Sequence, residues 1–263
     1  MKQFIICQIK LSTMLFSAIF VLVGFLSSSI NVRAVGGISN SKVVVPSTET
    51  VPKKHLEFEP FFSFEFVDDK DNTFRLGGGA RFTLGILENL EAGINVNFLN
   101  HENSDLIDTV NDFGDIEAGV KYRFLDQGGQ LPFSLAYQGG VSIPTSGNDT
   151  PWFIEIGGLI LTKDFSDVFS MDTDFVFGIV EDDGWNFISN IGFGYYIVPW
   201  FQAVIEGAYA YENIRSTQIV NVTPGFTSPV TDWLTIIIGV TPDIYTDNTD
   251  KEVVITTAFT FLF

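Results

Sequence analysis

Residues 73–99 read TFRLGGGARFTLGILENLEAGINVNFL, and this stretch decides the fold class. Within 73–86 the apolar residues Phe74, Leu76, Ala80, Phe82 and Leu84 alternate with Arg75, Gly77, Gly79, Arg81 and Thr83. A period of two sustained over about ten residues is typical of a β-strand with one apolar face. Because the alternation resumes in 90–99 after a short LENL connection, the stretch predicts an antiparallel hairpin.

The same alternation recurs along the chain and predicts twelve strands. Their expected ranges are 56–67, 73–86, 90–99, 115–124, 132–143, 152–162, 168–180, 185–197, 201–211, 218–227, 233–241 and 252–263. Each is near the ~9–11 residues that a tilted strand needs to cross a bilayer. Pro224 and Gly225 interrupt the tenth range, and Pro60 removes a hydrogen-bond donor from the first.

Two kinds of connection alternate between these strands. Those after even-numbered strands are mostly short, whereas those after odd-numbered strands include NHENSDLIDTVNDFG (100–114) and PDIYTDNTDK (242–251). Short periplasmic turns and longer extracellular loops are typical of outer-membrane barrels, whose termini lie on the periplasmic side. We therefore predict an all-β fold, a single closed antiparallel transmembrane β-barrel of about 12 strands over residues 55–263.

Alternation alone does not tell which face meets water, because a soluble barrel buries its apolar face. Here the apolar face is almost free of charge, while the other face carries Arg, Lys, Glu and Asp in mid-strand. Trp152, Trp185 and Trp233 fall at strand starts, where the interfacial girdles of a membrane barrel lie. These features favour lipid outside and a watery lumen inside; a soluble secreted β-sandwich is the alternative.

Composition excludes several other classes of protein. The chain has 14 Lys and Arg against 32 Asp and Glu, a net charge of -18, which disfavours nucleic acid as a partner. A single cysteine, Cys7, excludes a disulfide framework, and two histidines, His55 and His101, leave little for a metal site. We expect no cofactor, no metal and no catalytic residue, since neither histidine is placed where groups from several elements would converge.

The N-terminus has the organisation of a secretory signal peptide over residues 1–34. Lys2 and Lys10 precede or flank an apolar run at 11–26, and Val32-Arg33-Ala34 predicts cleavage after Ala34; an uncleaved anchor helix is the alternative. Cleavage would remove three basic residues and no acidic one, leaving 11 basic against 32 acidic. Residues 35–54 lack periodicity and predict a flexible periplasmic leader.

Several stretches resemble known outer-membrane proteins. The last strand, TTAFTFLF, ends on Phe263 and is similar to the assembly signal of bacterial outer-membrane barrels. The stretches RFTLGILENLEAGINV (81–96), FGDIEAGVKYRFLD (113–126) and VSIPTSGN (141–148) resemble a family of outer-membrane transporters named for the MetA pathway of phenol degradation. The residues that carry this likeness are Gly114, Asp115, Pro144, Thr145 and Gly147. Ser146 stands between Thr145 and Gly147, where the family has Thr-Gly directly after Pro.

This resemblance implies a location in the bacterial outer membrane, with outer-membrane lipid and the outer-membrane assembly machinery as partners. It also implies the passage of small solutes, among them aromatic or apolar compounds.

Hairpin arithmetic predicts a ladder of charges inside the barrel. If the first two strands turn around residue 70, Glu65 lies opposite Arg75 and Glu59 opposite Arg81; a turn around residue 106 places Glu91 opposite Lys121. Cross-strand pairs of this kind contribute roughly 0.2–1 kcal/mol each. We also expect Arg81 to approach Glu91. The alternative is that this ladder of charges only fixes the register of the strands and does not contact solute.

Strands six to nine are expected to form an acidic wall without basic neighbours. Glu155 should lie beside Asp174, Asp174 across from Asn190, and Asn190 across from Glu206. We hypothesise a transverse field between a basic and an acidic wall, made by Arg75, Arg81, Lys121 and Arg123 on one side and by Glu155, Asp172, Asp174 and Glu206 on the other. Such a field orients polar solutes. The alternative is that the basic side chains reach across and close the lumen.

Taken together, the patterns favour an outer-membrane channel for the passive passage of small molecules through a narrow charged lumen. The alternative is a non-conducting structural or adhesive barrel whose acidic loops bind a partner.

Overall fold

The computed structural model describes residues 37–40, 42–68, 73–103, 110–112, 114–128, 131–145, 152–181 and 184–263. The predicted signal peptide over 1–34 lies outside these residues. The strands are β1 (Leu56–Asp68), β2 (Phe74–Leu87), β3 (Leu90–Asn103), β4 (Val110–Asp112), β5 (Ile116–Leu125), β6 (Ser134–Ile143), β7 (Phe153–Ser166), β8 (Phe169–Val180), β9 (Gly184–Val198), β10 (Phe201–Glu212), β11 (Thr217–Thr231), β12 (Leu234–Asp247) and β13 (Lys251–Leu262). Within these ranges no helix is long and apolar enough to cross a bilayer.

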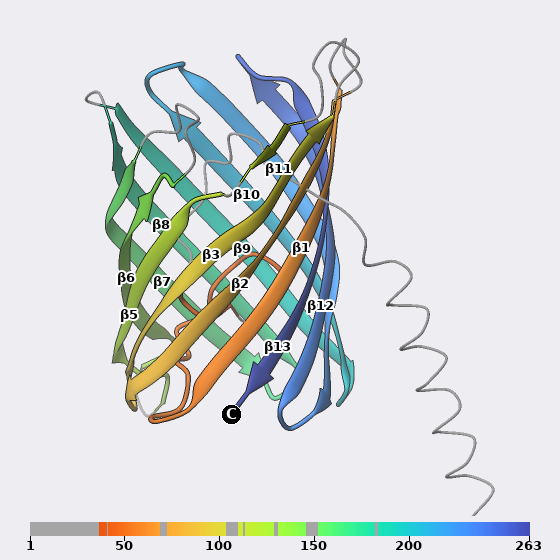
Figure 1. Cartoon of the computed structure of the whole chain (residues 1–263). Helices are drawn as coiled ribbons and strands as arrows, with labels where there is room; N and C mark the ends of the chain where they lie inside the picture. The colour runs from red at the N-terminus through yellow and green to blue at the C-terminus, as the bar shows by residue number, and fades with distance from the viewer. Residues whose placement is uncertain are drawn as a thin grey trace, which may run out of the picture.

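Twelve of the strands close into a single antiparallel barrel, as predicted (Figure 1). Each of these strands pairs with its neighbours in the chain, and β1 also pairs with β13, so the sheet has no open edge. At this seam Leu56 and Phe263 exchange both backbone hydrogen bonds, at 3.0 and 2.9 Å. The short β4 is an additional strand that pairs only with the outer end of β3.

The two rims of the barrel differ. Two-residue turns at 88–89, 167–168, 199–200 and 232–233 lie at the rim where β1 begins and β13 ends, which we call the lower rim (bottom of Figure 1). The connection over 126–133 is the longer exception at this rim. The opposite, upper rim carries the connections between β3 and β5 and between β6 and β7, which are the longest. Short turns therefore share a rim with the chain end, as the sequence predicted.

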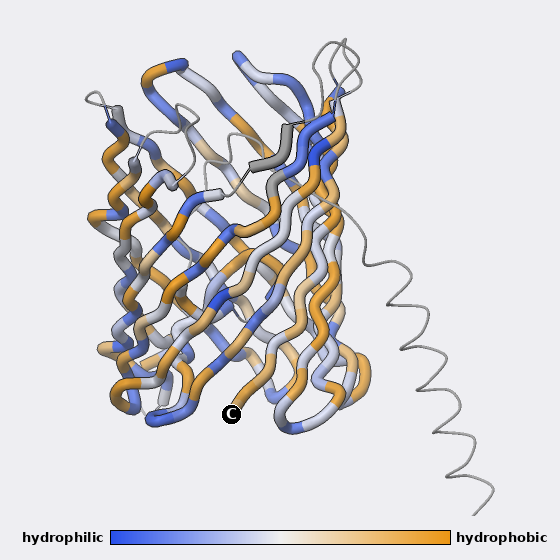
Figure 2. Tube along the Cα trace, viewed as in Figure 1, coloured by the Kyte–Doolittle hydropathy of each residue, from blue (hydrophilic) through white to orange (hydrophobic). Residues whose placement is uncertain are grey.

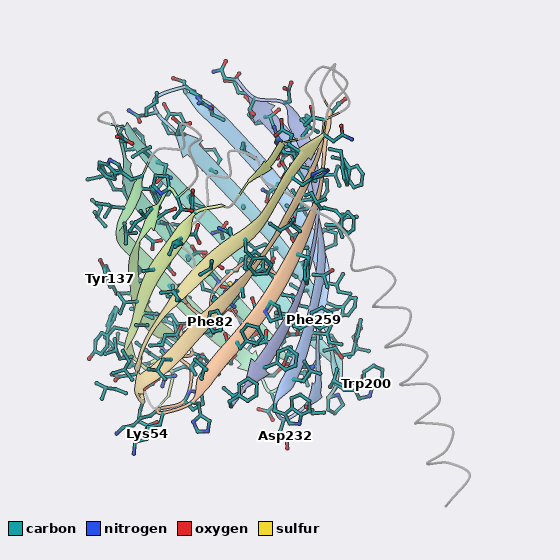
Figure 3. The ribbon with its side chains drawn as sticks, viewed as in Figure 1. Lys54, Phe82, Tyr137, Trp200, Asp232 and Phe259 are labelled. Carbon is teal, nitrogen blue, oxygen red and sulfur yellow. The ribbon has the colours of Figure 1, made fainter. Side chains whose placement is uncertain are left out.

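The apolar face of the sheet points outward and the charged face inward. Phe82 and Ile94 are 38% and 46% exposed, whereas Arg81 and Lys121 are 7% and 0% exposed. Figure 2 shows the resulting alternation of hydrophobic and hydrophilic residues along the strands, and Tyr137 and Trp200 project away from the wall in Figure 3. This orientation is the opposite of a soluble barrel or sandwich, whose apolar side chains meet at the centre.

β11 forms despite the proline and glycine in its middle. Pro224 lies opposite Ile205 in an uninterrupted ladder with β10, but the pairing with β12 omits residues 222–224. The proline therefore lies where one of the two ladders is interrupted, so its missing N–H group is tolerated there.

Candidate functional site

The barrel interior contains a segment of its own chain. Residues 37–40 and 42–52, which we call the lumen segment, lie inside the barrel and reach the lower rim just before β1 (Figure 1). Lys42, Val45 and Thr48 in this segment are almost completely buried. The prediction of a flexible periplasmic leader over 35–54 is therefore wrong for these residues, because inward-facing side chains of the wall bind the backbone of the segment.

The first anchor of the lumen segment is the ion pair between β3 and β5. Glu91 and Lys121 lie opposite each other, as predicted, with Lys121 Nζ 3.1 Å from Glu91 Oε1. Glu91 accepts hydrogen bonds from the backbone N–H groups of Ser39 and Val51, each at 2.7 Å. Lys121 donates to the carbonyl oxygens of Ser39 and Ser47, each at 3.1 Å. The pair thus holds both ends of the segment.

The second anchor is a buried ion pair between the lumen segment and β8. Lys42 Nζ bonds to Asp172, and it also lies 3.3 Å from Ser170 Oγ. The other oxygen of Asp172 accepts a hydrogen bond from Thr162 Oγ1 at 2.5 Å. Thr162 Oγ1 in turn accepts from the backbone N–H of Thr48 at 2.9 Å. Asp172 therefore obtains its cation from the segment, since the sequence gives it none on its own wall.

The third anchor is Glu206 on β10. Its carboxylate accepts the backbone N–H of Val44 at 3.1 Å and that of Val45 at 3.0 Å. The predicted position of Glu206 across from Asn190 is wrong, because Glu206 lies opposite Gly192. The hairpin turns at 199–200, and with the β-bulge between Phe201 and Gln202 this places the partner of Glu206 two residues beyond the predicted one.

Glycines on the inner face of the wall provide room for the segment. A Cβ atom added at Gly239 would lie 2.5 Å from Val43 Cγ1, and one at Gly192 would lie 3.1 Å from Lys42 Cδ. Gly85 similarly faces the backbone carbonyls of Val51 and Pro52. A strand glycine often marks the close approach of another backbone. These glycines therefore make room for the lumen segment and are not there to make the strands flexible.

Higher in the barrel, Arg75 joins three carboxylates. It lies opposite Glu65, as predicted, with Nη1 2.9 Å from Glu65 Oε1. The same Nη1 is 3.0 Å from Glu252, and Nε is 2.9 Å from Glu102. Its positive charge is therefore shared among carboxylates from β1, β3 and β13.

Arg81 pairs only partly as predicted. It lies opposite Glu59, with Nη2 2.8 Å from Glu59 Oε1 and 3.7 Å from Glu57 Oε1. On its other side it faces Asn95, so the expected approach to Glu91 is wrong. Asn95 is 7% exposed and donates from Nδ2 to Glu117 Oε2 at 2.8 Å.

Arg123 and Glu155 occupy positions that the predicted transverse field did not anticipate. Arg123 lies near the lower rim, where Nε is 2.8 Å from the exposed carboxylate of Asp126. Glu155 lies opposite Gly178 rather than opposite Asp174, because β7 extends to a turn at 167–168, further along the chain than predicted.

Asp174 is fully buried and lies opposite Asn190, as predicted, with Asn190 Nδ2 donating to it at 3.1 Å. In the lower half of the lumen, Lys121 and Asp172 each bind the lumen segment instead of facing each other across open space.

Above and beside the lumen segment lies a cavity of about 340 Å³. Val43, Val44 and Val45 of the segment border it from below, and Thr249 and Asp250 line it at the upper rim. Its walls carry charged residues from β1, β2, β5, β10, β12 and β13, two asparagines from β3, and apolar residues that are most numerous on β9, β10, β11 and β13. The apolar residues are Ile188, Ala208, Ala210, Ile219, Val254 and Ala258.

The fold is similar to those of solved outer-membrane proteins. The COG4313 outer-membrane channel from Pseudomonas putida F1 superposes with a TM-score of 0.69 at 9% identity, covering 82% of this chain and 98% of that one. The two chains share the fold of a closed antiparallel β-barrel. The NanC porin is similar with a TM-score of 0.53 at 10% identity, covering 78% and 98% of the two chains. No family model and no curated protein sequence matches the chain.

The motif residues that resemble the phenol-pathway family meet at the upper ends of β3, β5 and β6. Gly114 N donates to Asn97 O at 2.8 Å, and Asn97 Nδ2 donates to Asp115 O at 3.2 Å. Thr145 Oγ1 donates to Gly114 O at 2.6 Å and so joins the Pro144 corner to the start of β5. Gly147 lies outside the described residues. This geometry gives the motif a structural role in joining three strands.

The sequence reasoning missed the lumen segment as a functional element. Two signals could have revealed it. The acidic wall contained carboxylates without a cation, and Lys42 was a cation in the preceding stretch without a strand to carry it. Inward positions on several strands were also glycine, which indicates that another backbone approaches there.

Proposed function

We propose that the chain is an outer-membrane channel for the passive passage of small molecules, narrowed in its lower half by the lumen segment. The cavity that extends from Val43 to the upper rim carries this proposal. An apolar exterior, a polar interior and a closed ring of strands support it, because they are the features of barrels that admit solute through a lipid bilayer.

The remaining partners follow from the same arrangement. Outer-membrane lipid would cover the apolar exterior, with the lower rim in the periplasm after cleavage of residues 1–34. Phe263, at the seam, would be the residue that the assembly machinery recognises. Membership of the MetA-pathway family, and with it the passage of aromatic or apolar solutes, is supported by the motif stretches and by the apolar residues of the cavity wall.

The lumen segment offers a direct test. A Cβ atom added at Gly239 would lie 2.5 Å from Val43 Cγ1, so side chains at these two positions would be in contact, and we expect a Val43→Cys and Gly239→Cys pair to form a disulfide. The mature chain has no other cysteine, since Cys7 belongs to the predicted signal peptide. Conductance would be recorded in planar bilayers for the oxidised and reduced double variant, with each single-cysteine variant as control.

We expect reduction of the disulfide to increase conductance or the frequency of open events, with no such change in the single-cysteine variants. A further variant that lacks residues 37–52 should conduct at least as well as the reduced form, provided it migrates as a folded barrel in unheated SDS. If this folded deletion variant carries no current, the channel proposal is wrong.

The lumen segment also favours a second candidate function. Because it satisfies Glu91, Asp172 and Glu206, the barrel can be stable with its lumen permanently closed. The chain would then be a structural or adhesive barrel whose acidic loops bind a partner. Absence of current from the folded deletion variant, together with loss of partner binding after loop deletion, would favour this function.

A further inference from the structure

The apolar residues of the cavity above the lumen segment are grouped on one side, where they alternate with polar and charged residues such as Asn190 and Glu206. Ile188, Ala210, Ile219 and Val254 line this side, and Ile188 and Ala210 belong to a buried apolar cluster with Val176. The other side, formed by β1, β2, β3 and β5, is polar apart from Phe61. A solute that fits both sides must therefore have a polar group and an apolar body, as is usual for small-molecule pockets.

The charged lining of the cavity is predominantly negative. Among the described residues that line it are two guanidinium groups and six carboxylates: Arg75, Arg81, Glu59, Glu117, Glu206, Asp243, Asp250 and Glu252. Arg75 contacts three carboxylates and Arg81 contacts two, so neither arginine leaves a net positive field. A negative field in a confined space raises the local concentration of cations.

Asn95 supplies a second, independent indication. Its side chain lines the cavity and is 7% exposed, yet Oδ1 has no hydrogen-bond partner. The hydrogen bond from Asn95 Nδ2 to Glu117 Oε2 fixes the orientation of the amide group, so the atom without a partner is the acceptor oxygen Oδ1. A buried polar atom without a partner is costly, and a hydrogen-bond donor from a ligand would satisfy it.

We propose that the cavity binds a small primary ammonium ion with an apolar body. Its N–H groups donate to Asn95 Oδ1 and to the neighbouring Glu117 carboxylate, and its hydrocarbon lies against Ile188, Ala210 and Ile219. A primary ammonium carries three donors and no acceptor, which suits an amide oxygen beside a carboxylate. This assignment rests on the proposed function, because it treats the cavity as part of the route that solutes take.

The binding experiment uses three probes with the same body. Calorimetry on the folded, detergent-solubilised full mature barrel would compare 3-phenylpropylamine, 3-phenylpropanol and 3-phenylpropanoate. We expect the amine to bind at least about tenfold more tightly than the alcohol, because it adds charge-assisted hydrogen bonds. The carboxylate should bind more weakly than the alcohol, since the lining repels it.

Two variants and one control assign the binding to this site. Asn95→Leu removes the unpaired acceptor, and Glu117→Gln removes the charge while keeping the shape; each should reduce the affinity for the amine about tenfold and leave that for the alcohol nearly unchanged. Asp232→Asn removes a carboxylate from a turn at the lower rim, far from the cavity lining, and should change neither. Mobility in unheated SDS confirms folding, and Glu117→Gln decides alone if Asn95→Leu does not fold.

Equal binding of amine and carboxylate, or amine binding that both variants leave unchanged, would overturn this assignment. Calorimetry measures binding without an ion current, so the binding site and the channel can be disproved independently of each other. A barrel that binds the amine in the predicted way but never conducts would contradict the channel and keep the site. A barrel that conducts but does not prefer the amine would contradict the site and keep the channel.

Discussion

The lower and upper halves of the lumen are built from the same alternation of residues but have different interiors. In the lower half, Glu91, Lys121 and Asp172 are buried against the lumen segment, and each has a partner from it. In the upper half, Arg75 and Arg81 pair with carboxylates of the wall itself and leave a cavity beside them. Charges that look equivalent in the sequence therefore hold a peptide in one half and border a solute space in the other.

The difference follows from where partners are available. The carboxylates of Glu59 and Glu65 on β1 pair with arginines of the neighbouring strand β2, so their charges are balanced within the wall. A carboxylate on β8 or β10 has no such neighbour, and leaving it buried without a partner would be costly. The lumen segment supplies backbone N–H groups and Lys42 at those places. The most acidic part of the wall is therefore the part that the lumen segment covers.

The largest expected effect comes from breaking the lower half at Lys121. Lys121→Met leaves Glu91 buried without its cation and should reduce the free energy of unfolding by about 3–5 kcal/mol. Tryptophan fluorescence during unfolding by denaturant in lipid vesicles measures this loss. A double variant, Lys121→Met with Glu91→Gln, should recover part of the loss. If the double variant is no more stable than the single one, the ion pair is not what the stability depends on.

A smaller effect is expected at Lys42, because it binds the side chains of Asp172 and Ser170, whereas Lys121 also donates to two carbonyl oxygens of the lumen segment. Lys42→Met should cost about 1.5–3 kcal/mol, the range of hydrogen bonds to charged groups. It should also loosen the middle of the lumen segment. Maleimide labelling of a cysteine at Val43 reports this motion, and the rate should rise relative to the same cysteine with Lys42 intact. An unchanged labelling rate would show that the pair with Asp172 does not hold the segment.

The close approach of wall and segment can be tested with a single methyl group. Gly239→Ala places a Cβ atom 2.5 Å from Val43 Cγ1 and should reduce the free energy of unfolding by about 1–2 kcal/mol. Adding Val43→Ala should restore the stability, because it removes the obstructing carbons. Gly207→Ala is the matched control on β10, since its Cβ would have no neighbour nearer than 3.9 Å.

The smallest effect is expected at the lower rim, outside both halves. Arg123 pairs with Asp126, whose side chain is 70% exposed. Asp126→Asn should change the free energy of unfolding by no more than about 1 kcal/mol, because water screens exposed ion pairs. A loss as large as that of Lys121→Met would mean that burial is not what separates rim charges from lumen charges.

Register was predicted correctly where the turn was located correctly in the sequence and wrongly where it was not. Glu65 opposite Arg75 and Glu91 opposite Lys121 followed from turn positions alone. Glu155 and Glu206 were misplaced because their hairpins turn at 167–168 and 199–200, further along the chain than the predicted pairing assumed. Register depends on where the turn lies, and the alternation of side chains does not by itself show at which residue a strand ends.

The sequence by itself determined the barrel, since a period of two repeated in twelve segments fixes which side chains face outward and which face inward. It could not determine what fills the interior. Residues 37–40 and 42–52 form no regular element, and they are bound through backbone N–H and carbonyl groups that every sequence possesses. Only the closed tertiary structure decided their position, because buried carboxylates from separate strands had to converge before the segment had a place to bind.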